Sequence, residues 1–284
     1  MSLNLGIVGT TTTAETPWTW EAKDALLYAV GIGAGVDGGG AELALTTENS
    51  RGVAQAVAPT FPVVMGMGSG DVSMAEYGDF SMTQVLHAGQ EVRLHAPLPA
   101  AGSVTTTRGV SAIRDLGKHA LIEATAAFHD AATGELLAES VTHMMIRGEG
   151  GFGGERGPAE TWAVPEREPD VVVTEPTSAN QALIYRLSGD RNPLHSDPSF
   201  AERAGFPAPI LHGLCTYGYA GRAVLRHIVD GDTARFGSLF GRFSSPVFPG
   251  EALTTKLWRT EDGALFQTFV GDRLVLDRGA FTAR

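Results

Sequence analysis

The stretch SGDRNPLHSD, residues 188–197, places Asp190, Asn192 and His195 around a single proline. Gly189 tolerates unusual backbone angles, Asp and Asn bond to their own backbone, and the proline biases the residue before it away from helix. Such a run is typical of a surface turn. The alternative is that the turn brings Asp190 and His195 within reach of one small molecule, where a carboxylate and an imidazole can move protons.

A second segment, GFPAPILHGLCTYG at 205–218, leads into a helix predicted over 212–230. Gly213 falls at the start of this helix, where backbone N–H groups lack an intrahelical acceptor and the helix dipole favours a developing negative charge. The simpler interpretation is that Gly213 only starts the helix and that His212 is a packed or capping histidine. Cys215 lies inside the helix and is interpreted as a small buried hydrophobe.

Together these residues suit the addition of water across the double bond of an α,β-unsaturated thioester. That reaction needs a base for water, an acid for the α-carbon and a donor for the enolate oxygen. Asp190 and His195 are predicted to share the first two roles through one bound water. Asn192 would orient the water or the pair, and the Gly213 N–H would hold the oxygen. No metal site and no phosphate loop are predicted, because no metal-ligand spacing occurs and the glycine-rich run at 31–40 follows a helix.

The same landmarks occur twice in the chain. DALLYAVGIGAG at 24–35 resembles QALIYRLSGDRN at 181–192, and APLPAAGSVTT at 96–106 resembles SPVFPGEALTT at 245–255. The two pairs keep their order at nearly one offset, which indicates an internal duplication. The Gly-, Pro- and charge-rich segment at 147–170 is the predicted linker.

We therefore predict two domains, 1–149 and 150–284. The aligned positions of the first half hold no counterpart of Asp190 or His195. This difference predicts one site per chain, with the second half catalytic and the first half forming a wall of the substrate groove.

Each half begins with a short predicted helix, 20–29 capped by Thr19 and 179–187 capped by Thr177 or Ser178. Each half ends in strands separated by turn sequences typical of hairpins. The long helix of the second half is apolar on most sides, and its glycines would let a sheet approach closely. The predicted fold class is α+β, a long helix inside a curved antiparallel sheet, made twice.

The composition narrows the partners and the compartment. The net charge is −11 over 284 residues, with no basic stripe, so no nucleic-acid partner is predicted. No apolar stretch approaches the ~20 residues of a membrane span, and the first residues lack the pattern of a signal peptide. The single cysteine fits a reducing compartment. The expected location is the cytoplasm.

The segment YRLSGDRNPLHSDPSFA at 185–201 resembles the signature of the MaoC-like, R-specific enoyl-CoA hydratases, which have the hot-dog fold. GFPAPILHG and RFSSPVFPGE are similar to that family's entries into the central helix and into a strand. RGEGGFGG and LHAGQEVRLHAPLPAAGSVTTT resemble the long, double-hot-dog form found in the hydratase region of multifunctional β-oxidation enzymes. The resemblance covers about residues 20–284.

This resemblance implies reversible hydration of trans-2-enoyl-CoA to (3R)-3-hydroxyacyl-CoA without a redox cofactor. It matches Asp190 and His195 to the family's catalytic dyad and Asn192 to the accompanying asparagine. It matches Gly213 to the residue whose backbone amide forms the oxyanion hole. It further implies an acyl-CoA thioester as substrate, room for bulky acyl chains beside the first half, and pairing of chains into homodimers. No short motif fixes the residues that hold the CoA phosphates, and the candidates are Arg108, Arg114, Lys118 and Arg242.

Three other functions are open at this point. A hot-dog thioesterase often carries a carboxylate on or near the central helix, whereas the one acidic residue of 212–230 is Asp230 at its far end. A 3-hydroxyacyl-ACP dehydratase keeps the chemistry but needs an acidic carrier protein, which a chain of net charge −11 repels unless a basic patch is local. A silent acyl-CoA-binding or scaffolding member would have no need of Asp190, Asn192 and His195.

Overall fold

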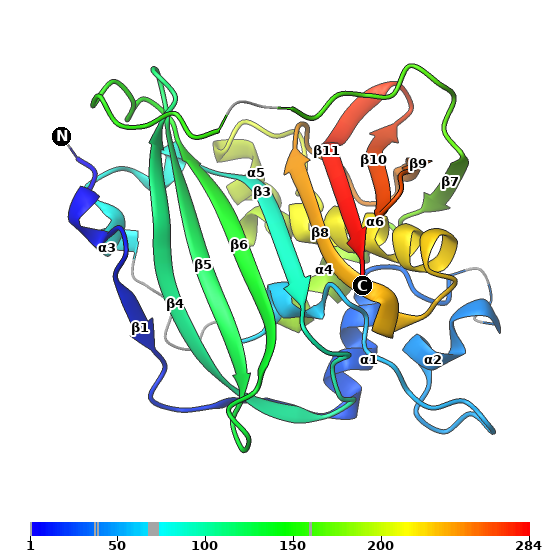
Figure 1. The fold of residues 1–284 in the computed structure, drawn as a ribbon. Helices are drawn as coiled ribbons and strands as arrows, with labels where there is room; N and C mark the ends of the chain where they lie inside the picture. The colour runs from blue at the N-terminus through cyan, green and yellow to red at the C-terminus, as the bar shows by residue number, and fades with distance from the viewer. Residues whose placement is uncertain (1, 37, 39, 68–73, 159–160) are drawn as a thin grey trace.

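The strands of both halves form one continuous antiparallel sheet (Figure 1). The computed structural model describes residues 2–36, 38, 40–67, 74–158 and 161–284. The sheet has the order β1-β4-β5-β6-β3-β8-β11-β10-β9-β7, with β2 paired to β4 off this path. Its strands are β1 Thr11–Thr13, β2 Trp18–Trp20, β3 Val85–Leu94, β4 Gly102–Asp115, β5 Ala120–Asp130, β6 Leu136–Ile146, β7 Val171–Pro176, β8 Phe236–Phe243, β9 Ala252–Arg259, β10 Gly263–Val270 and β11 Arg273–Ala283.

The strand order supports the duplication seen in the sequence. From the centre of the sheet outwards, the first half runs β3, β6, β5, β4 and the second half runs β8, β11, β10, β9. The two runs hold the same chain positions within their halves, and the predicted hairpins β5–β6, β9–β10 and β10–β11 are confirmed. The halves join where β3 pairs with β8, from Gly89 opposite Arg242 to Arg93 opposite Ser238. We call this junction the seam.

One long helix, α6 Gly213–Ile228, packs against the sheet of the second half (Figure 1). Most of its sixteen residues are buried, as expected for a helix that is apolar on most sides. Gly218 packs on the first half instead of on a sheet, which corrects the expectation for that glycine, whereas Gly221 faces both the first half and Leu239 of β8. A Cβ added at Gly218 would lie 2.3 Å from Ile32, and one at Gly221 would lie 2.5 Å from Thr60.

The remaining helices are short. They are η1 Leu5–Ile7, α1 Ala22–Gly31, η2 Gly40–Glu42, α2 Leu43–Thr46, η3 Phe61–Val64, α3 Met74–Tyr77, η4 Met82–Gln84, α4 Gln181–Tyr185, η5 Arg186–Ser188, η6 Pro193–His195, α5 Pro198–Arg203 and η7 Thr233–Arg235. Within the described part of the first half no helix matches α6 in length, so the long helix is not made twice. The stretch that would hold it is rich in Gly and Pro, which interrupt helices. Of the glycine-rich run at 31–40, residues 37 and 39 lie outside the described residues.

The predicted helix caps are wrong, although both short helices exist. Helix α1 begins after Glu21, whose carboxylate forms a capping box with Asp24, so Thr19 is not the cap. Helix α4 begins after Asn180 without a side-chain cap. The Thr177 hydroxyl instead donates to the Glu251 carbonyl at 2.7 Å. The Thr177 contact joins residues far apart in the chain, whereas the Glu21 and Asp24 box is a local pattern that our sequence analysis missed.

The segment between the halves, 147–170, is held by hydrogen bonds to both halves. Its described residues form no helix or strand before β7, as predicted for a linker, and 159 and 160 lie outside the described residues. The Asp115 carboxylate accepts hydrogen bonds from the backbone N–H groups of Gly151 and Gly153, and the Trp162 indole N–H donates to the Gly279 carbonyl. No helix in the described ranges is long and apolar enough to cross a membrane.

Candidate active site

The turn between α4 and α5 presents Asp190 through bonds within its own loop. Gly189 adopts a φ of 132°, a conformation that favours glycine, and so lets the chain reverse after η5. The Asp190 carboxylate accepts the Asn192 N–H at 3.1 Å. The Asn192 side-chain oxygen in turn accepts the Leu194 N–H at 3.0 Å and caps η6, which carries His195. Asn192 therefore shapes the segment that holds both members of the predicted dyad.

The tautomer of His195 follows from its one backbone contact. Its Nδ1 lies 2.9 Å from the Ile210 carbonyl oxygen, which can only accept, so Nδ1 carries the proton. Nε2 is then left with a lone pair. The side chain is 8% exposed, and burial lowers the pKa of His195 below its usual value. At neutral pH His195 is thus an uncharged imidazole that can accept a proton at Nε2.

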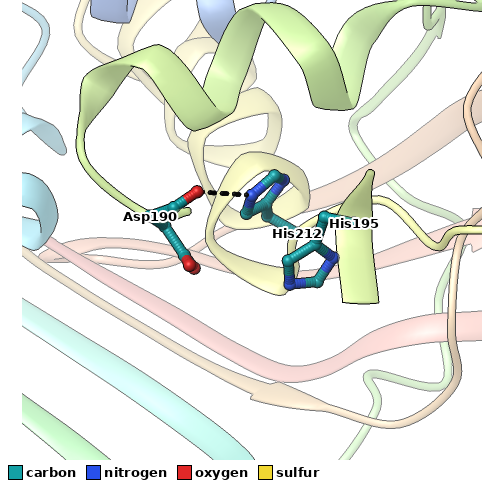
Figure 2. Close-up of side chains that lie close together, drawn as sticks. All are labelled: Asp190, His195 and His212. Atoms are coloured by element: carbon teal, nitrogen blue, oxygen red, sulfur yellow. Dashed lines mark hydrogen bonds between the residues drawn. The ribbon is translucent and has the colours of Figure 1, made fainter. Parts of the chain in front are cut away.

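Asp190 and His195 are brought together as predicted, and His212 joins them (Figure 2). One carboxylate oxygen of Asp190 and one ring nitrogen of each histidine all lie within 4.8 Å of one another. One water molecule spans a gap of this size with two hydrogen bonds of about 2.8 Å each. The turn therefore forms a site at which a carboxylate and an imidazole can act on one water.

His212 packs inside the site instead of facing the solvent. It is the N-cap residue of α6 but makes no side-chain capping bond, and it is 1% exposed. Its Nε2–H donates to the Asp190 carbonyl oxygen at 3.2 Å, and its ring stacks on His195 with centroids 3.8 Å apart. Burial, reinforced by the neighbouring His195, lowers the pKa of His212 to about 4.

Gly213 occupies the position predicted for an oxyanion donor. It is the first residue of α6 and lines the same cavity as Asp190 and His195. The helix N-terminus concentrates unpaired N–H groups and the positive end of the dipole there. A Cβ at this position would lie 3.1 Å from the Phe243 ring, closer than most side chains tolerate, so glycine also lets the helix start approach β8.

The cavity beside the dyad opens at the seam and has a volume of about 470 Å³. The pairing of β3 with β8 starts at Gly89, and a bulge at Ala88 shifts the register of β3 against β6. The β3 residues before this point line the cavity together with Phe243 of β8, mainly with apolar side chains. The first half contributes Val85, Leu86, His87, Ala88 and Met145 to this lining.

His87 is a polar lining residue that our sequence analysis missed. Its Nε2–H donates to the Gly89 carbonyl and to the Gln90 side-chain oxygen, at 3.1 and 3.2 Å, and its ring meets Phe243 edge-on. The ring faces the cavity, while the surrounding protein lowers the pKa of His87. The sequence signal was the LHAGQ run, in which a glycine follows a histidine within a strand.

The four basic residues named for the CoA phosphates lie outside this lining. Arg108 donates to the Gly66 carbonyl, Arg114 pairs with Glu123 at 3.0 Å, and Arg242 pairs with Asp277 at 3.1 Å. Lys118 is exposed in the turn between β4 and β5. Their role in binding CoA stays a prediction.

Comparison with known proteins matches each half of the chain to a family. Residues 160–277 match the family described as MaoC like domain, and residues 18–148 match the MFE-2 hydratase 2 N-terminal domain. The chain is 50% identical over 273 residues to 3-hydroxyacyl-thioester dehydratase Y of Mycobacterium tuberculosis, covering 92% of each chain. It is 37% identical over 274 residues to peroxisomal enoyl-CoA hydratase 2 of Arabidopsis thaliana, covering 91% of this chain and 88% of the relative.

A solved structure agrees with this placement. The crystal structure of a MaoC-like dehydratase from Phytophthora capsici superimposes with a TM-score of 0.89 at 34% identity, covering 99% of this chain and 98% of that one. The fold and the site define a hydro-lyase with a double hot-dog fold. The chain belongs to the MaoC-like dehydratase family, in the long form whose first half is the MFE-2 hydratase 2 N-terminal domain.

Proposed function

We propose that this protein is an (R)-specific 2-enoyl-CoA hydratase, which reversibly adds water to trans-2-enoyl-CoA and yields (3R)-3-hydroxyacyl-CoA. The observation that carries the proposal is the carboxylate and imidazole pair that lines the cavity at the seam. A carboxylate oxygen of Asp190 and a ring nitrogen of His195 lie within 4.8 Å, beside an apolar cavity formed by both halves. The name enoyl-CoA hydratase 2 of the Arabidopsis relative supports the same reaction.

His195 acts as the base toward water. Its Nε2 lone pair takes a proton as the water oxygen forms a bond to C3, and the C2=C3 electrons move into the thioester carbonyl. The Asp190 carboxylate accepts a hydrogen bond from the second O–H of the water, which stays on the oxygen, and stabilises the imidazolium. The proton on Nε2 then moves to C2, which restores neutral His195 and completes the addition with atoms and charge balanced.

The Gly213 N–H stabilises the enolate between these two proton transfers. Negative charge develops on the thioester oxygen, and a fixed donor at a helix N-terminus is worth about 10²–10³ in rate at comparable sites. No protein nucleophile is needed. Cys215 is fully buried and donates to the Gly31 carbonyl, and burial raises its pKa well above the usual value, so it takes no part.

The reverse reaction is the second candidate. The Mycobacterium relative is named a 3-hydroxyacyl-thioester dehydratase, and loss of water from a 3-hydroxyacyl thioester uses the same groups in the opposite order. A carrier-protein thioester would differ from a CoA thioester only outside the cavity. The net charge of −11 favours CoA over an acidic carrier protein as the group that carries the acyl chain.

A direct assay tests the proposal. Purified protein is mixed with trans-2-enoyl-CoA substrates of four to sixteen carbons, and loss of the conjugated thioester absorbance is followed. An R- or an S-specific dehydrogenase then reads the chirality of the product. Rapid loss with an R product supports the proposal, whereas release of free CoA thiol would indicate a thioesterase instead. Turnover of carrier-linked substrates alone would move the assignment to the dehydratase.

We propose that the two halves of the chain have different roles. Residues 1–149 form the half that walls the groove, and residues 150–284 form the catalytic half, a division supported by the two family matches and by the seam. We further propose a homodimer and a cytoplasmic location, the latter because a single buried cysteine suits a reducing compartment. Light scattering of the purified protein and fractionation of cells measure these two properties.

A further inference from the structure

His212 makes two contacts that converge on the catalytic pair. Its Nε2–H donates to the backbone carbonyl of Asp190, and its ring lies flat on that of His195 at an interplanar angle of 27°. One side chain therefore touches both Asp190 and His195, which arrive from opposite ends of the 188–197 turn (Figure 2). Because His212 is 1% exposed, it does not itself line the cavity.

Packing alone does not explain an imidazole at this position. His212 Nδ1 is buried and has no hydrogen-bond partner among the residues that the structure describes, and its ring also lies 4.8 Å from that of Tyr185 between centroids. An unpaired buried nitrogen costs stability, and a phenylalanine would fill the same space without that cost. The feature that only a polar ring supplies is the donor to Asp190.

The turn needs such a donor from outside. The Asp190 side chain is bonded to the N–H of Asn192, two residues along the same loop, and Gly189 before it has the freedom of glycine. His212 is fixed to the start of the long buried helix α6. Its bond therefore ties the backbone of this turn to a helix most of whose residues are buried.

We propose that His212 is a positioning residue for the hydration reaction, which holds the Asp190 backbone and the His195 ring in register through its Nε2–H donor and its stacked ring. This role rests on the proposed hydratase function. His212 stays uncharged while it does this, because burial lowers its pKa to about 4. The titratable and charged groups around it are Asp190, His195, Tyr185 and Arg186.

The kinetic test separates the two contacts. His212→Phe keeps a flat ring but removes the donor, and His212→Gln keeps an N–H donor but removes the ring. We expect His212→Phe to lower kcat about 10–100-fold with little change in KM, since a misplacement of about 1 Å costs about 10²-fold. His212→Gln should restore part of this loss. His227→Phe, at the other end of the same helix, is the matched control and should retain full activity.

A double variant separates positioning from general damage. If His212 acts through Asp190, His212→Phe added to Asp190→Asn should lower kcat little beyond Asp190→Asn alone. Losses that multiply, a rise in KM that matches the fall in kcat, or a fully active His212→Phe would each overturn the proposal. Thermal unfolding of each variant shows whether the folded fraction accounts for the loss.

A second measurement needs no substrate. Ring ¹⁵N spectra of the wild-type protein should show His212 neutral and protonated on Nε2 from pH 7 to 5, and His195 protonated on Nδ1. A His212 signal protonated on Nδ1, or titrating near its ordinary pKa, overturns the positioning role. Absence of turnover in the wild-type enzyme would instead overturn the hydratase proposal, so the two failures are distinguishable.

Discussion

Two backbone carbonyl groups determine which atoms of Asp190 and His195 are free to take part in proton transfer. The Ile210 carbonyl fixes the proton of His195 on Nδ1 and so leaves Nε2 as the basic atom. The Asp190 carbonyl accepts from His212 and leaves the carboxylate to the turn and the cavity. Backbone acceptors thus decide which side-chain atoms are available for proton transfer.

The first expectation concerns these two side chains. Asp190→Asn and His195→Ala should each lower kcat by about 10²–10⁴, the usual worth of a positioned acid or base. If both act on one water, as we propose, the double variant should be only slightly worse than either single variant. Steady-state kinetics of the three variants measure this. Losses that multiply would show that the two groups act on separate steps.

The turn chemistry around Pro193 was readable from the sequence, but its surroundings were not. Gly-Asp-x-Asn-Pro predicts a turn with polar side chains in the right places, and the family signature names their roles. The contacts of His212 and His87 join residues far apart in the chain. No local pattern specifies such pairs, so only the folded seam reveals them.

Among the elements, the hairpins were the most predictable and the first half the least. Strand alternation and Asp-Gly or Thr-Gly turns carry their own local signal, whereas the Thr177 hydroxyl, a predicted helix cap, is bonded instead to the distant Glu251 carbonyl. The double repeat predicted two long helices, but only α6 forms among the described residues. In its place the first half supplies loops that pack on the glycines of α6.

A buried ion cluster ties those loops to α6. Arg222, 4% exposed, pairs with Glu42 at 2.6 Å and with Glu175 at 3.1 Å, and it also donates to the Ile32 carbonyl. Glu42 and Ile32 belong to the first half and Glu175 to β7. Burial raises the pKa of Glu175, although Arg222 opposes this. The cluster therefore joins three elements through one guanidinium.

The expectation at this scale concerns stability. Arg222→Met should lower the free energy of unfolding at pH 7 by about 3–5 kcal/mol, because it leaves two buried carboxylates without their partner. Since a carboxyl whose pKa is raised by folding destabilises the native state as pH rises through that pKa, the loss should shrink toward pH 5. Urea unfolding of the variant and the wild type at both pH values measures it.

The matched control for this expectation is Glu175→Gln. It removes the titrating group that the pKa shift concerns while leaving Arg222 paired with Glu42. In the Glu175→Gln, Arg222→Met double variant the recovery toward pH 5 should be smaller than in Arg222→Met alone. An equal recovery in both would assign the pH dependence to other groups.

The whole molecule depends on the seam, because neither half completes the site alone. The second half carries Asp190, His195 and Gly213, while the first half supplies one wall of the cavity and the loops against α6. The pairing of β3 with β8 also covers what would otherwise be an open sheet edge. Such an edge promotes aggregation when it is exposed.

We therefore expect a fragment of residues 161–284 to be insoluble or inactive on its own, because it exposes the β8 edge, the Gly218–Gly221 face of α6 and the unpaired side of Arg222. Co-expression with residues 2–158 should restore a soluble pair and hydratase activity, since the linker is held by contacts to both halves and is not itself part of the cavity. Size-exclusion chromatography and the enoyl-CoA assay measure the two outcomes. A fragment 161–284 that is soluble and as active as the full chain would show that the first half is dispensable for catalysis, and the cavity would then have to be completed within the second half.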